Sequence, residues 1–406
     1  MSEIRKRIER AAGEGLFDHP FILNSWAYEG TATMKPPLLG IPENMKKAHD
    51  NCIAFVINRC YQHSLDDPCC KINAEYAEVV REWGRMTSDL ALWGGEYYNV
   101  SRHEDLPLLF MDNMKRSMRF YHESGAKGIT YMHTPITGWS VRAMTQMLHS
   151  LLAWNIDADT EVASSEFFHL RYGCHADSMK KVYGYIEEAS EPVAEWRAWR
   201  HSILCQMYSS FDGDNVDTPL GFRHYASHAE AVADGEKCAV LYQKAWETIA
   251  DEFEKEKDLA SGDFHLIAPE NPDQAYASKT YDRIANALAE DLRLVNYGHD
   301  VMEIMTLVVA YYDACFRKCE PEKEAIWIRI REQERLMQAY TILVVYNAWK
   351  PFHECRDALT RSQMRQAINA IRKQRLMHRR KCVIEKNVPK KMCHDTLEIE
   401  TKGDVY

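Results

Sequence analysis

Four short apolar segments separated by helical patterns organise the first 154 residues of the chain. They read FILNSWAY (21–28), NCIAFVINRC (51–60), DLALWGGEYY (89–98) and GITYMHTPI (128–136). Short apolar runs rich in β-branched and aromatic residues are typical of strands. Strands that alternate with helices predict a parallel sheet, because each parallel strand is reached through a crossover connection. We therefore expect an α/β unit of about four βα repeats here.

Apolar side chains at spacings of three and four residues mark the connecting helices. The first helix is expected to have Asn73 as its N-cap, and the second is expected to stop at Gly125. The apolar positions are Tyr76, Val79, Val80, Trp83 and Met86, then Met111, Met114, Met118 and Tyr121, then Val141, Met144, Leu148, Leu151 and Leu152. Residues 3–15 also have a helical pattern, and the long link between the first two strands has room for a short helix.

Only helical patterns follow from about residue 158, so the expected fold class is α/β followed by all-α. Long patterns run over residues 276–297, 299–318, 321–349 and 357–381. Gly298 is expected to separate the first two patterns, and Pro321 suits the first turn of the third. The expected divisions are the α/β unit (1–156), a helical extension packed on it (157–260), a helical C-terminal domain (261–385) and a disordered polar tail (386–406).

Composition limits the possible partners and location. The 406 residues carry a formal net charge of -10, which gives no overall attraction to nucleic acid or to an anionic membrane. No apolar run approaches the roughly 20 residues of a membrane-spanning helix, and the first 15 residues lack the apolar centre of a secretion signal. The 12 cysteines form no C-x-x-C pair, so we expect a reducing, cytoplasmic location, or export if upstream sequence is missing. The sequence predicts no cofactor.

An ordered set of motifs lies along the first 190 residues, several of them at the ends of the expected strands. They are WAYEGTATMKPP, the pattern C-x-x-H-S-L-D-D-x-C-C-x-x-N from Cys60 to Asn73, LALWGGEYY, and the Trp-Asn-x-Asp and Tyr-Gly elements between residues 154 and 173. Over roughly residues 16–190, this set resembles the C-terminal half of a barrel family known as domain of unknown function 4838. That family overlaps glycoside hydrolase family 163, the endo-β-N-acetylglucosaminidases.

The resemblance implies the C-terminal half of a (β/α)8 TIM-like barrel, whose active site lies at the carboxyl ends of the strands. It also implies hydrolysis of N-acetylglucosamine-containing glycans, with the substrate's own N-acetyl group as nucleophile. The candidate catalytic residues are Glu29 and Glu96. The candidate substrate-binding residues are Asn24, Trp26, Tyr28, His63, Trp93, Tyr97, Tyr98 and His133. Trp154 is expected to be a packing residue.

One departure from the family pattern bears on catalysis. The acidic pair is expected after the fourth strand of such a barrel, whereas the strand at 21–28 resembles the fifth. The first four strands then have no counterpart in this sequence, and we expect a second copy or a partner chain to complete the barrel. Two rival functions stay open: a non-catalytic carbohydrate-binding or relic module, and a helical protein-interaction module formed by residues 200–406.

The loop after the second strand contains three potential metal ligands. His63 could bind zinc with Cys60 and either Cys69 or Cys70. Their spacing matches no common structural zinc arrangement, so we assign no metal. A disulfide between Cys60 and Cys70 in an exported relative is the favoured alternative.

Overall fold

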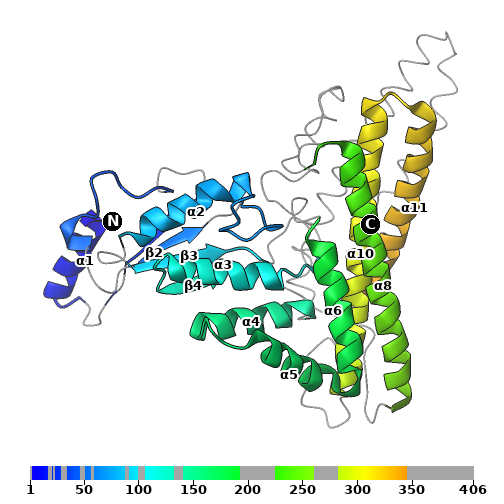
Figure 1. Cartoon of the computed structure of the whole chain (residues 1–406), viewed down its shortest axis with the longest axis horizontal. Helices are drawn as coiled ribbons and strands as arrows, with labels where there is room; N and C mark the ends of the chain where they lie inside the picture. Colours follow the sequence, from blue (N-terminus) through cyan, green and yellow to red (C-terminus); the bar gives the residue numbers. More distant parts are fainter. Residues whose placement is uncertain are drawn as a thin grey trace.

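The computed structural model of the chain describes residues 2–16, 21, 23–28, 34–45, 51–55, 59–86, 91–98, 106–131, 140–192, 225–259 and 282–344. A small sheet with its helices lies beside a group of long helices (Figure 1). The helix expected over residues 357–381 and the polar tail lie outside the described residues. Within the described ranges, no helix is long and apolar enough to span a bilayer.

The predicted α/β unit is confirmed as a four-stranded parallel sheet. The strands are β1 (Asn24–Tyr28), β2 (Asn51–Phe55), β3 (Ala91–Glu96) and β4 (Gly128–Tyr131). Their order in the sheet is the order in the sequence, β1-β2-β3-β4, and each neighbouring pair is parallel. The link from β1 to β2 contains the short helix η1 (Glu43–Met45), which the sequence left room for, and α1 (Ser2–Gly13) precedes the sheet.

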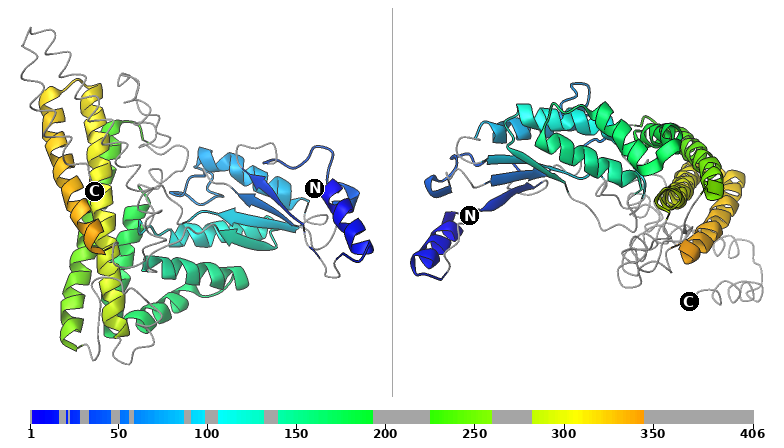
Figure 2. Two further views of the ribbon diagram at one scale, coloured as in Figure 1. Left: turned by 180° about the vertical axis from the view of Figure 1, so that it is seen from behind. Right: turned by 90° about the horizontal axis from the view of Figure 1, so that it is seen from below.

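Helices α2 (Lys71–Gly84) and α3 (Met111–Glu123) cover one face of this sheet. Strand residues alternate between the two faces, so Ala27, Cys52, Ala54 and Leu92 point to these helices and are buried. They pack against Val80 and Trp83 of α2 and Phe120 and Tyr121 of α3, among others. The described helices leave the opposite face uncovered (Figure 2), and we call it the open face.

Asn73 does not cap α2, contrary to our expectation. The helix begins two residues earlier, at Lys71, and Cys70 is its N-cap. The Asn73 side chain is buried and binds the preceding loop instead. Its Oδ1 accepts from the Cys60 amide at 2.7 Å, and its Nδ2 donates to the carbonyl oxygens of Cys60, His63 and Ser64. A single amide therefore fixes the loop between β2 and α2.

Three helices continue from the sheet: α4 (Val141–Trp154), α5 (Thr160–Tyr172) and α6 (Ala176–Ser190). Asp159 caps α5, because its carboxylate accepts from the amides of Glu161 and Val162. Trp154 differs from the prediction. It ends α4 with its side chain 93% exposed, so it is not a packing residue in the described structure.

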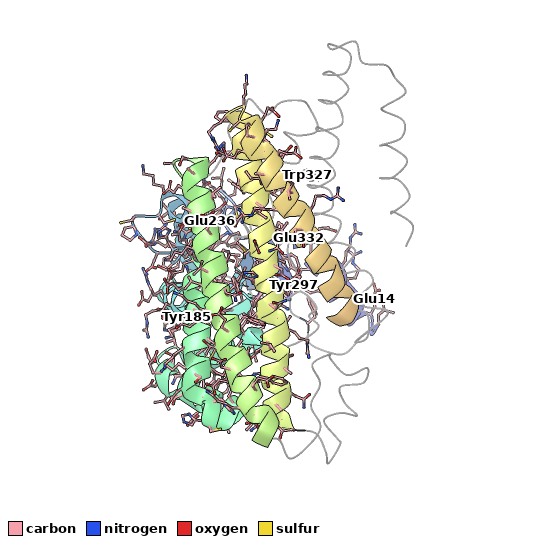
Figure 3. The ribbon with its side chains drawn as sticks, turned by 90° about the vertical axis from the view of Figure 1, so that its right-hand side faces the viewer. Glu14, Tyr185, Glu236, Tyr297, Trp327 and Glu332 are labelled. Carbon is pink, nitrogen blue, oxygen red and sulfur yellow. The ribbon has the colours of Figure 1, made fainter. Side chains whose placement is uncertain are left out.

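The C-terminal helices are α8 (His228–Leu259), α10 (Arg283–Phe316) and α11 (Glu320–Val344). Helices α8 and α10 lie side by side, with Tyr297 on α10 and Trp327 on α11 (Figure 3). Pro321 lies in the first turn of α11, as predicted. The apolar core of these helices is continuous with that of α4, α5 and α6. It contains residues from both sides of residue 260, the expected boundary between the helical extension and the C-terminal domain.

The predicted break at Gly298 is wrong, because α10 runs without interruption from Arg283 to Phe316. Gly298 is buried at a close contact with two rings. A Cβ atom there would lie 2.8 Å from Pro107 Cγ and 2.8 Å from Tyr242 Cε1. The glycine is present because its neighbours leave no space for a side chain.

A buried polar cluster joins α5 to α10. The Tyr172 hydroxyl donates to Asp291 Oδ2 and contacts the Tyr183 hydroxyl at 2.7 Å. Arg171 Nη2 pairs with Glu290 Oε2 at 2.6 Å. Helix α10 is thus held to the helices that follow the sheet.

A second buried cluster joins α8 to η2 (Gly173–His175), the turn before α6. His175 Nδ1 lies 2.7 Å from Glu252 Oε2, and its Nε2 lies 2.7 Å from Glu256 Oε2. Burial lowers the pKa of His175, but the two carboxylates outweigh burial and raise that pKa above its ordinary 6.5. Burial raises the pKa of Glu252, but hydrogen bonds from His175 and Lys255 outweigh burial and lower that pKa to about 2.

These shifts predict a pH-dependent contribution to stability. Because the pKa of His175 is raised in the folded state, its contribution to stability is fully present below pH 6.5. That contribution is lost as the pH rises through the pKa of the folded state. Because the pKa of Glu252 is lowered in the folded state, its contribution to stability is fully present above pH 4.5. That contribution is lost as the pH falls toward about 2. His175→Gln is therefore expected to reduce the free energy of unfolding by about 1–2 kcal/mol near pH ~6 and by much less near pH ~9.

Urea denaturation across this pH range measures the effect. His169→Gln is the matched control, because His169 is exposed on α5 and its Nδ1 contacts the Ser165 carbonyl oxygen. The control should track the wild type at every pH. A loss in His175→Gln that is the same at both ends of the range would contradict the proposed ionic contact.

Candidate functional site

The open face of the sheet brings several of the candidate residues into rows across the strands. Trp26 pairs with Ile53, Ile53 with Trp93, and Trp93 with Gly128. Paired residues on parallel strands point to the same face, so both tryptophans lie on the open face. Trp26 is 52% exposed and Trp93 is half-buried. One row of the sheet therefore carries two indole rings with accessible surface.

Gly128 makes room for the Trp93 ring. A Cβ atom at position 128 would lie 2.8 Å from Cε2 and 2.9 Å from Cδ2 of the indole, closer than real contacts allow. The indole therefore lies against the backbone of β4. Its orientation is fixed by the neighbouring strand, which reduces the entropy that a bound ligand would have to overcome.

Two tyrosines follow toward the carboxyl end of the sheet: Tyr28 is half-buried, and Tyr97 is buried, with 4% of its surface exposed. Trp26 and Tyr28 are stacked, with ring centroids 6.3 Å apart and an interplanar angle of 26°. The Tyr97 hydroxyl donates to the Tyr28 hydroxyl at 3.4 Å. Asn24, at the start of β1, is exposed on the same face. We call Asn24, Trp26, Tyr28, Trp93 and Tyr97 the aromatic platform.

Glu96 points the other way, toward α3, because it alternates with Tyr97 and Gly95. Its Oε2 accepts from Arg59 Nε at 2.9 Å and from the Tyr61 hydroxyl at 2.7 Å, and both members of the ion pair are fully buried. Its Oε1 has no hydrogen-bond partner among the residues described. The carboxylate is thus an acceptor inside the protein, away from the open face.

Arg59 holds Glu96 to the surrounding elements. Its Nη2 donates to Asn113 Oδ1 and Ser117 Oγ of α3 at 3.1 and 3.3 Å, and its guanidinium lies 3.9 Å from the Tyr61 ring centroid. Burial lowers the pKa of Arg59, but the charge of Glu96 outweighs it and raises that pKa above its ordinary value. The guanidinium therefore stays charged and ties β3, α3 and the loop after β2 together.

The remaining candidate residues lie elsewhere. Tyr98 is fully buried, packs edge-on against Tyr61, and burial raises its pKa well above the ordinary value. His63 is half-buried in the loop between β2 and α2, with Nδ1 3.3 Å from Cys60 Sγ. Glu29 and His133 lie outside the described residues.

The family comparison agrees with the resemblance read from the motifs. A family model described as Domain of unknown function (DUF4838) matches residues 21–184, fewer than half of the 406 residues. The chain resembles the DUF4838 family. The DUF4838 match includes the sheet, the aromatic platform and helices α2 to α5, and it ends within α6. No match was found among curated proteins or among solved structures.

Sequence reasoning missed the residues that hold Glu96 at the end of β3. The strand and helix patterns place Arg59 and Tyr61 only at the polar end of a strand and in its loop, and Asn113 only in an amphipathic helix. The available signal was a charged residue close behind an apolar run, since a charge at the end of a buried strand needs a partner. The spacing between Arg59 and Glu96 could not reveal that partner.

Proposed function

We propose that this chain binds N-acetylglucosamine-containing oligosaccharides on the aromatic platform. The observation that carries the proposal is the exposed Trp26 ring, stacked on Tyr28 and in the same row of the sheet as Trp93. Flat, rigid rings bury the apolar faces of sugar rings at little entropic cost, and Tyr28 and Asn24 supply polar groups for hydroxyl and N-acetyl groups.

The fold is consistent with a barrel origin. A consecutively ordered parallel sheet with helices on one face is the arrangement of successive units in a (β/α)8 barrel, with sites at the carboxyl ends of the strands. In this proposal, the open face corresponds to the barrel interior. A second copy or a partner chain that pairs with β1 or β4 would complete it, since these are the edges of the described sheet.

Hydrolysis of the bound glycan is a further part of the proposal. A general acid must reach the leaving oxygen of the sugar. We assign Glu96 a supporting role, because Arg59 and Tyr61 hold its carboxylate toward α3. Glu29, one residue beyond β1, is then the carboxylate to test for acid chemistry.

Loss of either tryptophan from the platform is expected to weaken glycan binding. Trp26→Ala and Trp93→Ala should each raise the dissociation constant for chitooligosaccharides by about 10–100-fold, from the loss of about 1.5–3 kcal/mol of apolar burial. Isothermal titration calorimetry with the full chain measures this. Trp26→Ala is the cleaner variant, because the exposed ring contributes less to the fold than the half-buried Trp93.

Trp154→Ala is the matched control. Trp154 is more exposed than Trp26 but lies at the end of α4, outside the platform. It should bind the oligosaccharide as the wild type does. Equal losses in Trp26→Ala and Trp154→Ala would indicate nonspecific binding, and a wild-type chain without measurable affinity would refute the proposal.

A further inference from the structure

The loop between β2 and α2 brings two cysteine sulfur atoms and one histidine ring nitrogen together. The Sγ atoms of Cys60 and Cys70 and a ring nitrogen of His63 all lie within 4.8 Å of one another. Cys60 Sγ lies 3.3 Å from His63 Nδ1. Ligands around a tetrahedral zinc ion, with Zn–S near ~2.3 Å and Zn–N near ~2.0 Å, lie roughly 3.5–3.8 Å from one another. Small side-chain rotations would satisfy that geometry.

Hydrogen bonds from two side chains hold the loop in this shape. Asn73 binds the amide and carbonyl of Cys60 and the carbonyl of His63. Arg59 also donates to the carbonyl oxygens of Cys60 and His63, at 3.1 and 3.3 Å. Cys70 is fixed as the N-cap of α2. The three ligands therefore sit on a preorganised backbone, which reduces the entropic cost of binding an ion.

One of the two thiols lies where a thiolate is favoured. Cys70 is the N-cap of α2, and a cysteine at a helix N-terminus favours the thiolate, which is the form that binds metal.

We propose that Cys60, His63 and Cys70 form a zinc site that clamps the β2–α2 loop. Two thiolates and one imidazole are ligands that Zn²⁺ prefers among biological divalent ions. Cys60 and Cys70 are buried and His63 is half-buried. Three protein ligands would leave the fourth position of a tetrahedral zinc site for water. The ion would hold the loop that carries Arg59 and Tyr61, and these side chains bind Glu96 at the end of β3.

A second cluster in the described residues is less suited to a metal. Cys174, His175 and Glu256 also have ligand atoms within 4.8 Å. Both ring nitrogens of His175, however, already contact carboxylates at 2.7 Å. A metal there would have to displace one of these contacts, whereas the contact of Cys60 Sγ with His63 Nδ1 joins two of the proposed ligands to each other.

Cobalt binding to the full chain tests the proposal. Protein purified under reducing conditions and stripped with a chelator is titrated with Co²⁺, whose thiolate charge-transfer absorption reports sulfur ligation, and the bound Co²⁺ is then displaced with Zn²⁺. We expect one equivalent to bind to the wild type. His63→Ala and Cys70→Ser should each weaken binding at least tenfold. Circular dichroism checks that each variant is folded.

Cys69→Ser is the matched control, because Cys69 is adjacent to Cys70 in sequence but exposed and outside the cluster. It should bind cobalt and zinc as the wild type does. His63→Ala keeps both thiols, so its loss of binding distinguishes a metal site from a thiol pair. The proposal is overturned if the reduced wild type takes up no metal, if Cys174→Ser rather than Cys70→Ser abolishes binding, or if Cys60 and Cys70 form a disulfide that persists under thiol reductant.

Discussion

Replacing Arg59 with methionine is expected to lower the free energy of unfolding by about 3–5 kcal/mol. Methionine keeps much of the length of the side chain but removes the charge. Glu96 would then be a buried carboxylate without its cation, and Asn113 and Ser117 would lose a shared donor. Urea denaturation followed by tryptophan fluorescence measures the change, because Trp83 and Trp93 lie on α2 and β3 of the sheet unit.

Burial, rather than the ion pair itself, is the reason for this large effect. Arg119 and Asp157 form an ion pair with the same separation of 2.9 Å, but both side chains are exposed. Arg119→Met is therefore expected to cost less than about 1 kcal/mol. The double variant Arg59→Met with Glu96→Gln should lose less than the sum of the single variants, because it leaves no unpaired charge. Additive losses, or equal losses at the buried and exposed pairs, would contradict the assigned network.

A side chain at Gly298 should produce the second large effect. Gly298→Val is expected to destabilise the helical core by about 2–3 kcal/mol, since the added atoms would overlap the rings of Pro107 and Tyr242 and the core can relax only partly. Thermal unfolding followed by circular dichroism measures the change in the helical region.

Gly184 provides the control for this substitution. It also lies inside a helix, α6, but nothing lies within 4 Å of a Cβ atom placed there. Gly184→Val should be neutral or slightly stabilising, because valine has a higher helix propensity than glycine. If both variants behaved alike, the contact of Gly298 with Pro107 and Tyr242 would not be the reason for the glycine.

Hydrophobic periodicity was sufficient for the local elements. The four strands and the helices around them follow from apolar alternation and from spacings of three and four residues, which depend on neighbours in the chain. Asp159 caps α5 and Pro321 begins α11 for equally local reasons: a carboxylate that accepts from first-turn amides, and a ring with a fixed φ. The alternation of side chains along β1 also places Asn24, Trp26 and Tyr28 on one face.

Non-local contacts defeated the same reasoning. Asn73 resembles an N-cap, but its amide finds better partners in the loop 10 to 13 residues earlier. Gly298 resembles a helix end, but it is a contact point for residues far away in the chain. At the end of β3, alternation places Tyr97 on the open face and Glu96 on the face covered by the helices. There Glu96 pairs with Arg59, which lies 37 residues earlier in the sequence.

The sequence by itself determined the order of strands and helices, their approximate bounds, the parallel sheet and the aromatic character of one strand face. Only the tertiary structure decided that Arg59 pairs with Glu96 and that His175 lies between Glu252 and Glu256. It also decided that Cys70, and not Cys69, lies beside Cys60 and His63. Periodicity records which side of an element is buried, because burial is a property of each position. A buried charge is stabilised by whichever opposite charge the packing brings within reach, and that distance is set by the whole fold.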